Sequence, residues 1–244
     1  MQNNPKKTIG IIGGVGPMAG VLLQKLIIEM TPAHKDQEHI PVITYTNPNI
    51  PDRTASLLGP KAGMDFVFEI QKTANILARA GAQIIALPCN TAHARFVEIQ
   101  KGVPVPIINM VFETVNIIRK KYGNPQVGLL ATDGTIFSGI YQSVAPDIEW
   151  LLPSKEDQKE VMKTIYGIKS GSNIEASIIK VTRNLVERGA EVIITGCTEL
   201  SLIYSKLIVT AIPVPIVDSS RTLAKTLVKQ VFNIPVDFDS SLKH

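Results

Sequence analysis

The chain has 244 residues, of which 45% are hydrophobic and 19% are charged, with a formal net charge of +4. This length fits one large domain or two small ones, and the composition is sufficient for a hydrophobic core. Scattered lysines and arginines, only 5% aromatic residues and no run of about 18 uncharged apolar residues argue against binding to nucleic acid or to a membrane.

Residues 1–7 run directly into a strand pattern, without the apolar core and cleavage site of a signal peptide. We therefore expect a cytoplasmic protein, in which thiols stay reduced. The chain has two cysteines, Cys89 and Cys197. Inert buried thiols, or a disulfide between them, are the simplest interpretation of such a pair.

Short apolar, β-rich runs alternate with longer amphipathic segments along the whole chain. The expected strands are residues 8–12, 42–46, 83–87, 107–108, 127–130 and 191–194. The expected helices are residues 19–30, 64–80, 111–121, 154–168, 174–188 and 219–231, with a further helix that opens at residue 90 or 91. Strands separated by helical crossovers predict parallel sheets that are covered on both faces.

The two halves of the chain repeat each other. Three pairs of segments recur in the same order, namely 9–12 with 127–130, 80–91 with 188–199, and 103–109 with 212–218. The second pair, AGAQIIALPCNT and RGAEVIITGCTE, places Cys89 and Cys197 at equivalent positions, 108 residues apart. We therefore expect an α/β fold of two pseudo-symmetric lobes, each a parallel four-stranded sheet flanked by helices. The active site would lie in the interlobe cleft, since parallel sheets bind ligands at the carboxyl ends of their strands.

A glycine-rich turn, GVGPMA at residues 14–19, follows the first strand and satisfies the GxGxxG/A pattern of dinucleotide sites. The second strand, however, ends in Tyr45-Thr46-Asn47 and not in the acidic residue that would hold a ribose hydroxyl. The equivalent loop of the second half, residues 131–135, has no phosphate-binding glycine pattern. We therefore expect no nucleotide cofactor, and a tight turn whose backbone N–H groups could hold a carboxylate.

Each cysteine follows a buried strand and stands where a helix begins, in PCNT at residues 88–91 and GCTE at residues 196–199. A helix N-terminus favours negative charge and would lower the pKa of a thiol from about 8.5 toward neutrality. The symmetry of the repeat would make the two sulfurs face each other across one substrate.

Two opposed acid–base groups are what inversion at a carbon centre requires. One thiolate removes the α-proton from one face, and the opposite thiol gives a proton to the other face, so the two titrations are coupled. Asn90, Thr91 and Thr198 are placed to stabilise the charge that develops on the substrate carboxylate. A single catalytic thiol would fit a decarboxylase or another isomerase better, whereas a matched pair fits racemisation.

The sequence resembles the aspartate/glutamate racemase family, and within it the aspartate racemase branch. The resemblance covers essentially the whole chain and rests on the motifs at residues 9–19, 47–54, 88–93, 128–135, 165–171 and 196–200. It implies a two-base mechanism without pyridoxal phosphate or metal, with Cys89 and Cys197 as the bases. It also implies homodimers.

The resemblance further implies that the two lobes exchange their last strand and helix. The N-terminal lobe, which carries Cys89, would then comprise residues 1–106 plus 213–244. The C-terminal lobe, which carries Cys197, would comprise residues 107–212.

The resemblance also carries over substrate-binding residues. Arg53 and Lys169 match positions that bind the substrate's side-chain carboxylate, a role suited to a guanidinium that binds carboxylates through two donors. The structural alternatives are a turn arginine paired with Asp52 and a solvated lysine at a helix end. Met18, Asn47 and Thr132 are expected to line the pocket.

Two further residues bear on the chemistry. His93 would either tune the thiol of Cys89 or serve only in capping and packing. Glu199 stands where the glutamate racemase branch tends to carry a histidine, and with the opening GGVGP it favours aspartate over glutamate. The alternatives are a related cysteine-dependent isomerase or decarboxylase of small dicarboxylates, or a non-catalytic dicarboxylate-binding protein.

Overall fold

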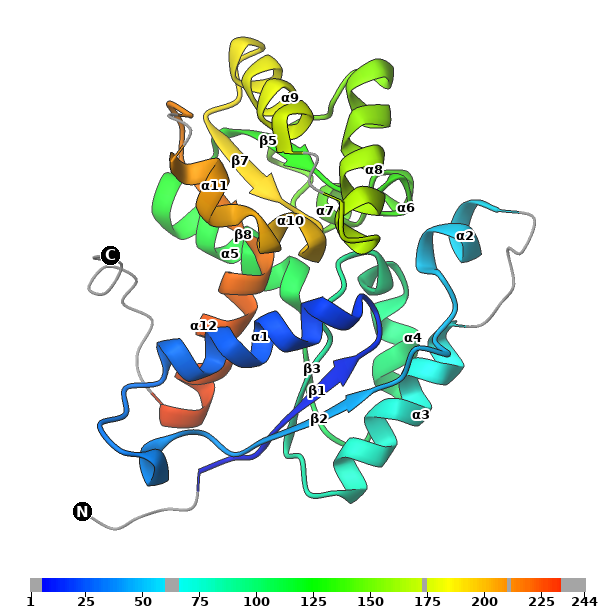
Figure 1. Cartoon of the computed structure of the whole chain (residues 1–244), viewed down its shortest axis with the longest axis vertical. Helices are drawn as coiled ribbons and strands as arrows, with labels where there is room; N and C mark the ends of the chain where they lie inside the picture. Colours follow the sequence, from blue (N-terminus) through cyan, green and yellow to red (C-terminus); the bar gives the residue numbers. More distant parts are fainter. Residues whose placement is uncertain (1–5, 60–65, 173–174, 210–211, 234–244) are drawn as a thin grey trace.

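The computed structural model describes residues 6–59, 66–172, 175–209 and 212–233, and Figure 1 shows their arrangement. The N-terminal sheet has the order β2-β1-β3-β4 and the C-terminal sheet the order β6-β5-β7-β8, and every strand pairing is parallel. The strands are β1 Ile9–Gly13, β2 Val42–Thr46, β3 Ile84–Ala86, β4 Ile107–Ile108, β5 Gln126–Leu130, β6 Glu149–Leu151, β7 Val192–Thr195 and β8 Ile216–Asp218. The matching order of the two sheets confirms the expected fold of two pseudo-symmetric α/β lobes.

The helices are α1 Pro17–Met30, α2 Arg53–Leu58, α3 Phe66–Arg79, α4 Phe96–Lys101, α5 Met110–Tyr122, α6 Asp133–Ser138, α7 Ile140–Val144, α8 Lys155–Lys169, α9 Glu175–Glu187, α10 Thr198–Leu202, α11 Tyr204–Val209 and α12 Ser219–Phe232, with 3-10 turns η1 Asp36–Glu38 and η2 Thr91–Arg95. The long helices agree with the sequence patterns. Residues 64–65 and 174, at the expected starts of α3 and α9, lie outside the described residues, as do residues 1–5 and 234–244. No helix within the described ranges is long and apolar enough to cross a membrane.

The repeated motifs of the two halves have the same local structure. Gly81 and Gly189 each end a helix with φ near +103°, a conformation that glycine adopts without the steric cost of a Cβ. Asn109 and Asp218 each close a strand and cap the following helix, through bonds from the N–H of Phe112 at 3.0 Å and of Arg221 at 2.8 Å. The repeat therefore encodes the strand-to-helix junctions of both lobes.

The exchange between the lobes differs from our expectation. Strand β8 pairs with β7 in the C-terminal sheet, and β4 pairs with β3 in the N-terminal sheet. The expected assignment of residue 107 to the C-terminal lobe and of residues 213–218 to the N-terminal lobe was therefore wrong for these strands. Each of them lies beside the preceding strand of the chain in the same sheet, because a short crossover connects the two.

The helices that follow these two strands do cross between the lobes. Helix α5 follows β4 but packs on α7 and β8, and α12 follows β8 but packs on α1. The two also pack on each other, and Figure 1 shows α12 beside α1. One apolar cluster consequently runs through both lobes, from Ile11 through Met110 and Leu223 to Leu129. The lobes share a core, so the cleft between them has a defined shape.

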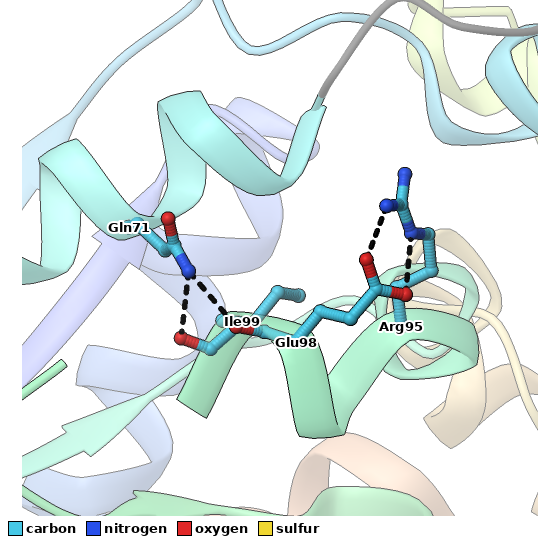
Figure 2. Close-up of polar contacts among 4 residues, drawn as sticks. All are labelled: Gln71, Arg95, Glu98 and Ile99. Atoms are coloured by element: carbon cyan, nitrogen blue, oxygen red, sulfur yellow. Dashed lines mark hydrogen bonds and ion pairs between the residues drawn. The ribbon is translucent and has the colours of Figure 1, made fainter. Parts of the chain in front are cut away.

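Polar contacts hold α4, which follows the first cysteine, against α3. Gln71 of α3 donates from Nε2 to the carbonyl oxygens of Glu98 at 2.8 Å and Ile99 at 3.5 Å, as Figure 2 shows. Within the same segment, Arg95 at the end of η2 donates from Nε to Glu98 Oε1 of α4 at 2.9 Å and also pairs with Oε2. Because these contacts are at the surface, they orient α4 more than they stabilise the fold.

Candidate active site

A small cavity lies between the lobes and contains both cysteines. It encloses about 310 Å³ of space between atoms, part of which is open to solvent. Its lining residues come from both lobes and are Val15, Asp52, Arg53, Thr54, Cys89, Asn90, Thr91, Thr132, Lys169, Cys197, Thr198 and Glu199. The structure therefore brings together eight of the ten residues that the sequence singled out.

Both cysteines follow the carboxyl ends of equivalent strands, Cys89 after β3 and Cys197 after β7. Their exposed fractions are nearly equal, 6% and 5%. Both are free thiols, so the alternative of a disulfide between them is wrong. Cys197 is the N-terminal cap of α10, whereas Cys89 leads into the 3-10 turn η2.

Glu199 is the closest charged partner of Cys197. The sulfur donates a hydrogen bond to Glu199 Oε2 over 3.0 Å, and Thr198 Oγ1 donates to the same oxygen over 3.4 Å. Burial, followed by the charge of Glu199, raises the pKa of Cys197 well above its usual value. The expectation of a lowered pKa was therefore wrong for this thiol, because burial and the adjacent carboxylate outweigh the N-terminus of a five-residue helix.

Arg53 is the charged partner of Cys89. Its guanidinium lines the cavity together with the thiol and donates from Nη1 to the carbonyl of Pro51 at 2.9 Å, while its buried Nε has no hydrogen-bond partner. Burial acts to lower the pKa of Arg53, but Cys89, Asp52 and Glu199 raise it above its usual value. Asp52 itself caps α2 through the N–H of Ala55 at 2.8 Å. Arg53 is thus a cation held in place at the cavity wall.

Lys169 ends α8 and is a second cation of the cavity. The residue as a whole is exposed, as the alternative of a solvated lysine at a helix end expected, although its amino group reaches the cavity. Partial desolvation of the amino group acts to lower its pKa, but Glu199, Cys197 and Asp52 raise it above its usual value. Its Nζ also lies 5.2 Å from the centre of the Tyr166 ring. The site thus combines two cationic side chains with two carboxylates and two thiols.

Asn90 connects the first cysteine loop to the C-terminal lobe. Its Oδ1 accepts a hydrogen bond from Tyr141 at 2.7 Å, and its Nδ2 donates to Ser219 Oγ at 3.0 Å. Ser219 in turn donates to the backbone carbonyl of Thr195, two residues before Cys197, at 2.9 Å. Half of the hydrogen-bonding capacity of the Asn90 side chain is therefore used in holding the lobes together.

Three threonine hydroxyls meet where the lobes touch. Thr91 Oγ1 lies 2.9 Å from Thr132 Oγ1 and 3.0 Å from Thr135 Oγ1, and the latter two are 3.0 Å apart. Thr132 also caps α6. These hydroxyls are buried donors and acceptors beside the cavity, suited to binding a carboxylate.

The ring of His93 is buried and bonded to the backbone through both nitrogens. Met110 N–H donates to Nε2 at 3.2 Å, which leaves the proton on Nδ1, 2.8 Å from the carbonyl oxygen of Cys89. Burial lowers the pKa of His93 to about 4. Both ring nitrogens are thus occupied by backbone groups, and of the two roles considered from sequence these contacts favour capping and packing.

The glycine-rich turn faces a carboxylate that belongs to the protein itself. A Cβ on Gly16, which has φ of +104°, would lie 2.6 Å from Glu199 Oε1. Gly16 is the N-terminal cap of α1, so Glu199 of the C-terminal lobe sits at the N-terminus of a helix of the other lobe. This packing gives the glycine at position 16 a structural reason, because any side chain there would collide with the carboxylate.

A sequence model described as Asp/Glu/Hydantoin racemase matches residues 12–227. The chain belongs to this family. It is 29% identical to the broad specificity amino-acid racemase RacX of Bacillus subtilis (strain 168) over 230 residues, which cover 90% of this chain and 96% of that protein. It is thus an isomerase of the amino-acid racemase class.

Solved structures agree with this assignment. Picrophilus torridus aspartate racemase has 31% identity and a TM-score of 0.82, with coverage of 93% of this chain and 94% of that one. An aspartate racemase homologue from Pyrococcus horikoshii OT3 has 26% identity and a TM-score of 0.72, with coverage of 93% and 99%. The resemblance inferred from the sequence is confirmed.

Two expected pocket residues do not line the cavity. Met18 is 56% exposed on the first turn of α1. Asn47 is buried, but its Nδ2 donates to Thr73 Oγ1 at 3.0 Å, and its Oδ1 accepts from the N–H of Asn49 at 3.1 Å. Asn47 therefore fixes the end of β2.

Sequence reasoning did not include four lining residues among the site residues, namely Val15, Asp52, Thr54 and Glu199. Asp52 and Thr54 flank Arg53, and Val15 belongs to the glycine-rich turn. Glu199 is part of the GCTE motif, and its acidic character next to a cysteine was the available signal. No group of three or more histidine, cysteine, aspartate or glutamate side chains in the described ranges is arranged to hold a metal ion.

Proposed function

We propose that the chain interconverts L- and D-aspartate by proton transfer to and from Cys89 and Cys197, without a cofactor. The observation that carries this proposal is that the two repeat-equivalent thiols line one cavity together with Arg53 and Lys169. One sulfur takes the α-proton while the other delivers a proton to the opposite face of the same carbon. Neither thiol alone inverts the centre by this route.

The charges of the cavity suit a dicarboxylic amino acid. Arg53 and Lys169 would hold the side-chain carboxylate, since a guanidinium and an ammonium group both form charge-assisted hydrogen bonds with it. Nearby backbone N–H groups would stabilise the α-carboxylate as the α-proton leaves, together with the hydroxyls of Thr91, Thr132 and Thr198 once these exchange their present partners for the substrate. The substrate range includes glutamate as a second candidate, and the relative named as a broad specificity racemase supports testing a wider panel.

Chiral chromatography after incubation with L-aspartate tests the proposal. We expect D-aspartate to form with the unaltered chain, and Cys89→Ala and Cys197→Ala each to abolish racemisation. Each single variant retains exchange of the α-hydrogen with deuterium from D₂O on one face only. Ser143→Ala, at an exposed serine outside the cavity, is the control and keeps full activity. Full racemisation by Cys89→Ala would contradict the mechanism.

The same preparations distinguish the related reactions. Conversion of maleate or loss of CO₂ from a malonate, without any change in the configuration of aspartate or glutamate, would favour the isomerase or decarboxylase alternative. A melting shift with aspartate but no turnover would favour a binding protein.

We further propose a cytoplasmic homodimer. A reducing compartment keeps both thiols free, as the mechanism requires. Exposed apolar side chains along α1, namely Met18, Val21 and Ile28, support self-association. A monomeric mass in light scattering at micromolar concentration would contradict the dimer.

A further inference from the structure

The two cysteines occupy equivalent positions but have unequal surroundings. In the repeat, the position equivalent to Glu199 is Thr91. The hydroxyl of Thr91 bonds to Thr132 and Thr135, so this position supplies no carboxylate to the thiol of Cys89. The charged neighbour of Cys89 is instead the guanidinium of Arg53. One sulfur therefore faces a negative group and the other a positive one.

Glu199 is held so that its carboxylate stays on Cys197. Its Oε2 accepts hydrogen bonds from Cys197 Sγ and Thr198 Oγ1 at 3.0 and 3.4 Å. Its Oε1 packs against Gly16, where even a Cβ would approach to 2.6 Å. The side chain is 6% exposed and lies at the N-terminus of α1, where negative charge is favoured. It is fixed by groups from both lobes.

We propose that Glu199 is a positioning residue that keeps Cys197 as an oriented, protonated thiol, so that the resting enzyme uses Cys89 as the proton acceptor and Cys197 as the donor. This inference rests on the proposed racemase function. In the direction that starts from this resting state, the Cα–H bond of the substrate breaks as an S–H bond forms at Cys89. The S–H bond of Cys197 breaks as a new Cα–H bond forms on the opposite face, and no electron is gained or lost overall.

The other charged groups at Cys197 agree with this assignment. Besides Glu199, the groups that face it are Lys169 from α8 and the phenol of Tyr141 from α7. Lys169 acts to lower the pKa of the thiol, but burial and Glu199 outweigh it and raise that pKa well above its usual value.

Competitive alkylation of the two thiols tests the inference. The intact chain is treated briefly with iodoacetamide near pH 7.5, and modification of each cysteine is measured by peptide mass spectrometry. Because the exposed fractions are 6% and 5%, a difference in rate reports the thiolate fraction more than access. We expect Cys89 to react about tenfold faster or more, because Glu199 holds Cys197 as the less reactive thiol.

Glu199→Gln removes the charge and keeps the size and an acceptor oxygen. We expect the alkylation rate of Cys197 to rise about tenfold in this variant while that of Cys89 is unchanged. Glu187→Gln, an exposed carboxylate at the end of α9, is the matched control and leaves both rates unchanged. Circular dichroism checks that the variants fold. If Glu199→Gln does not fold, the ratio of the Cys89 and Cys197 alkylation rates in the unaltered chain tests the inference.

Equal rates in the unaltered chain, a faster Cys197, or an unchanged ratio in folded Glu199→Gln would each overturn the inference. Racemisation is measured on the same samples. A Cys89-selective pattern without racemisation of any amino acid would leave the thiol asymmetry standing and refute the proposed function. Racemisation with equally reactive thiols would support the proposed function and refute the asymmetry of the thiols.

Discussion

Arg53 shows how one residue combines a local structural role with a role in the cavity. Its Nη1 fixes the turn before α2 by donating to the carbonyl of Pro51, while its Nε is buried without a hydrogen-bond partner and its charge acts on Cys89. The structural alternative considered from sequence, a turn arginine, is thus part of its role. The side chain still supplies a buried positive charge to the cavity.

Arg53→Lys retains the charge but loses the planar set of donors. We expect the KM for aspartate to rise about tenfold or more, since a charge-assisted hydrogen bond contributes about 1.5–3 kcal/mol. Steady-state kinetics with aspartate and alanine measure this change. If the chain also racemises alanine, which has no side-chain carboxylate, its KM serves as the control. A variant with an unchanged KM for aspartate would contradict the binding role.

At the scale of elements, short junctions after the strands carry the site. The turn η2 begins directly after Asn90 and is tied to the start of α5 by the buried imidazole of His93, which bonds the carbonyl of Cys89 and the N–H of Met110. The ring also stacks on Phe96 at 5.4 Å. A neutral imidazole fits this place because it offers one donor and one acceptor.

This burial predicts a pH dependence of stability. The pKa of His93 is about 4 in the folded chain, against 6.5 for a free imidazole. Above pH 6.5 the group is neutral in both states and its contribution is fully present. As the pH falls from 6.5 to 4, the unfolded chain takes up a proton that the folded chain does not. The free energy of unfolding therefore falls, by about 3 kcal/mol in total.

Urea unfolding between pH 7 and pH 4.5 measures the effect. His93→Gln should be less stable at pH 7 but show a weaker pH dependence, by about 1.4 kcal/mol per pH unit within the window. His34→Gln, which removes an exposed histidine, should run parallel to the unaltered chain. Equal slopes for His93→Gln and the unaltered chain would show that His93 titrates normally when folded.

For the whole molecule, the two cysteine loops are linked through Ser219 at the start of α12. Its hydroxyl accepts from Asn90 Nδ2 at 3.0 Å and donates to the Thr195 carbonyl at 2.9 Å, and it is completely buried. Asn90, which follows Cys89, and Thr195, two residues before Cys197, are thus joined through Ser219 by two hydrogen bonds. A two-base reaction needs this, because both sulfurs must hold fixed positions on opposite sides of one carbon.

Ser219→Ala should lower stability by about 1–3 kcal/mol, since it leaves buried polar groups of Asn90 and Thr195 without this partner. We expect kcat for aspartate to fall while KM changes little, because the spacing of the sulfurs is affected more than the binding of the carboxylates. Ser143→Ala, an exposed serine with a local bond to Ile140, is the control. An unaltered kcat in Ser219→Ala would show that the link does not position the thiols.

The sequence by itself determined the local structure and the symmetry. Alternating apolar runs predicted the main strands and helices, and the repeat placed Cys89 and Cys197 at the same junction of each lobe, because a junction needs the same glycine, strand and capping residues each time it occurs. It did not reveal β6 as a strand, since its three residues are only partly buried or exposed.

Only the tertiary structure decided what each junction faces. The crossing of α5 and α12 between the lobes, the turn of Asn47 away from the cavity, and the meeting of Glu199 with Gly16 all depend on contacts between residues far apart in the chain. For the same reason the raised pKa of Cys197 did not follow from its helix N-terminus. Burial and the fixed position of a neighbouring carboxylate set that pKa, and both exist only once the two lobes have packed together.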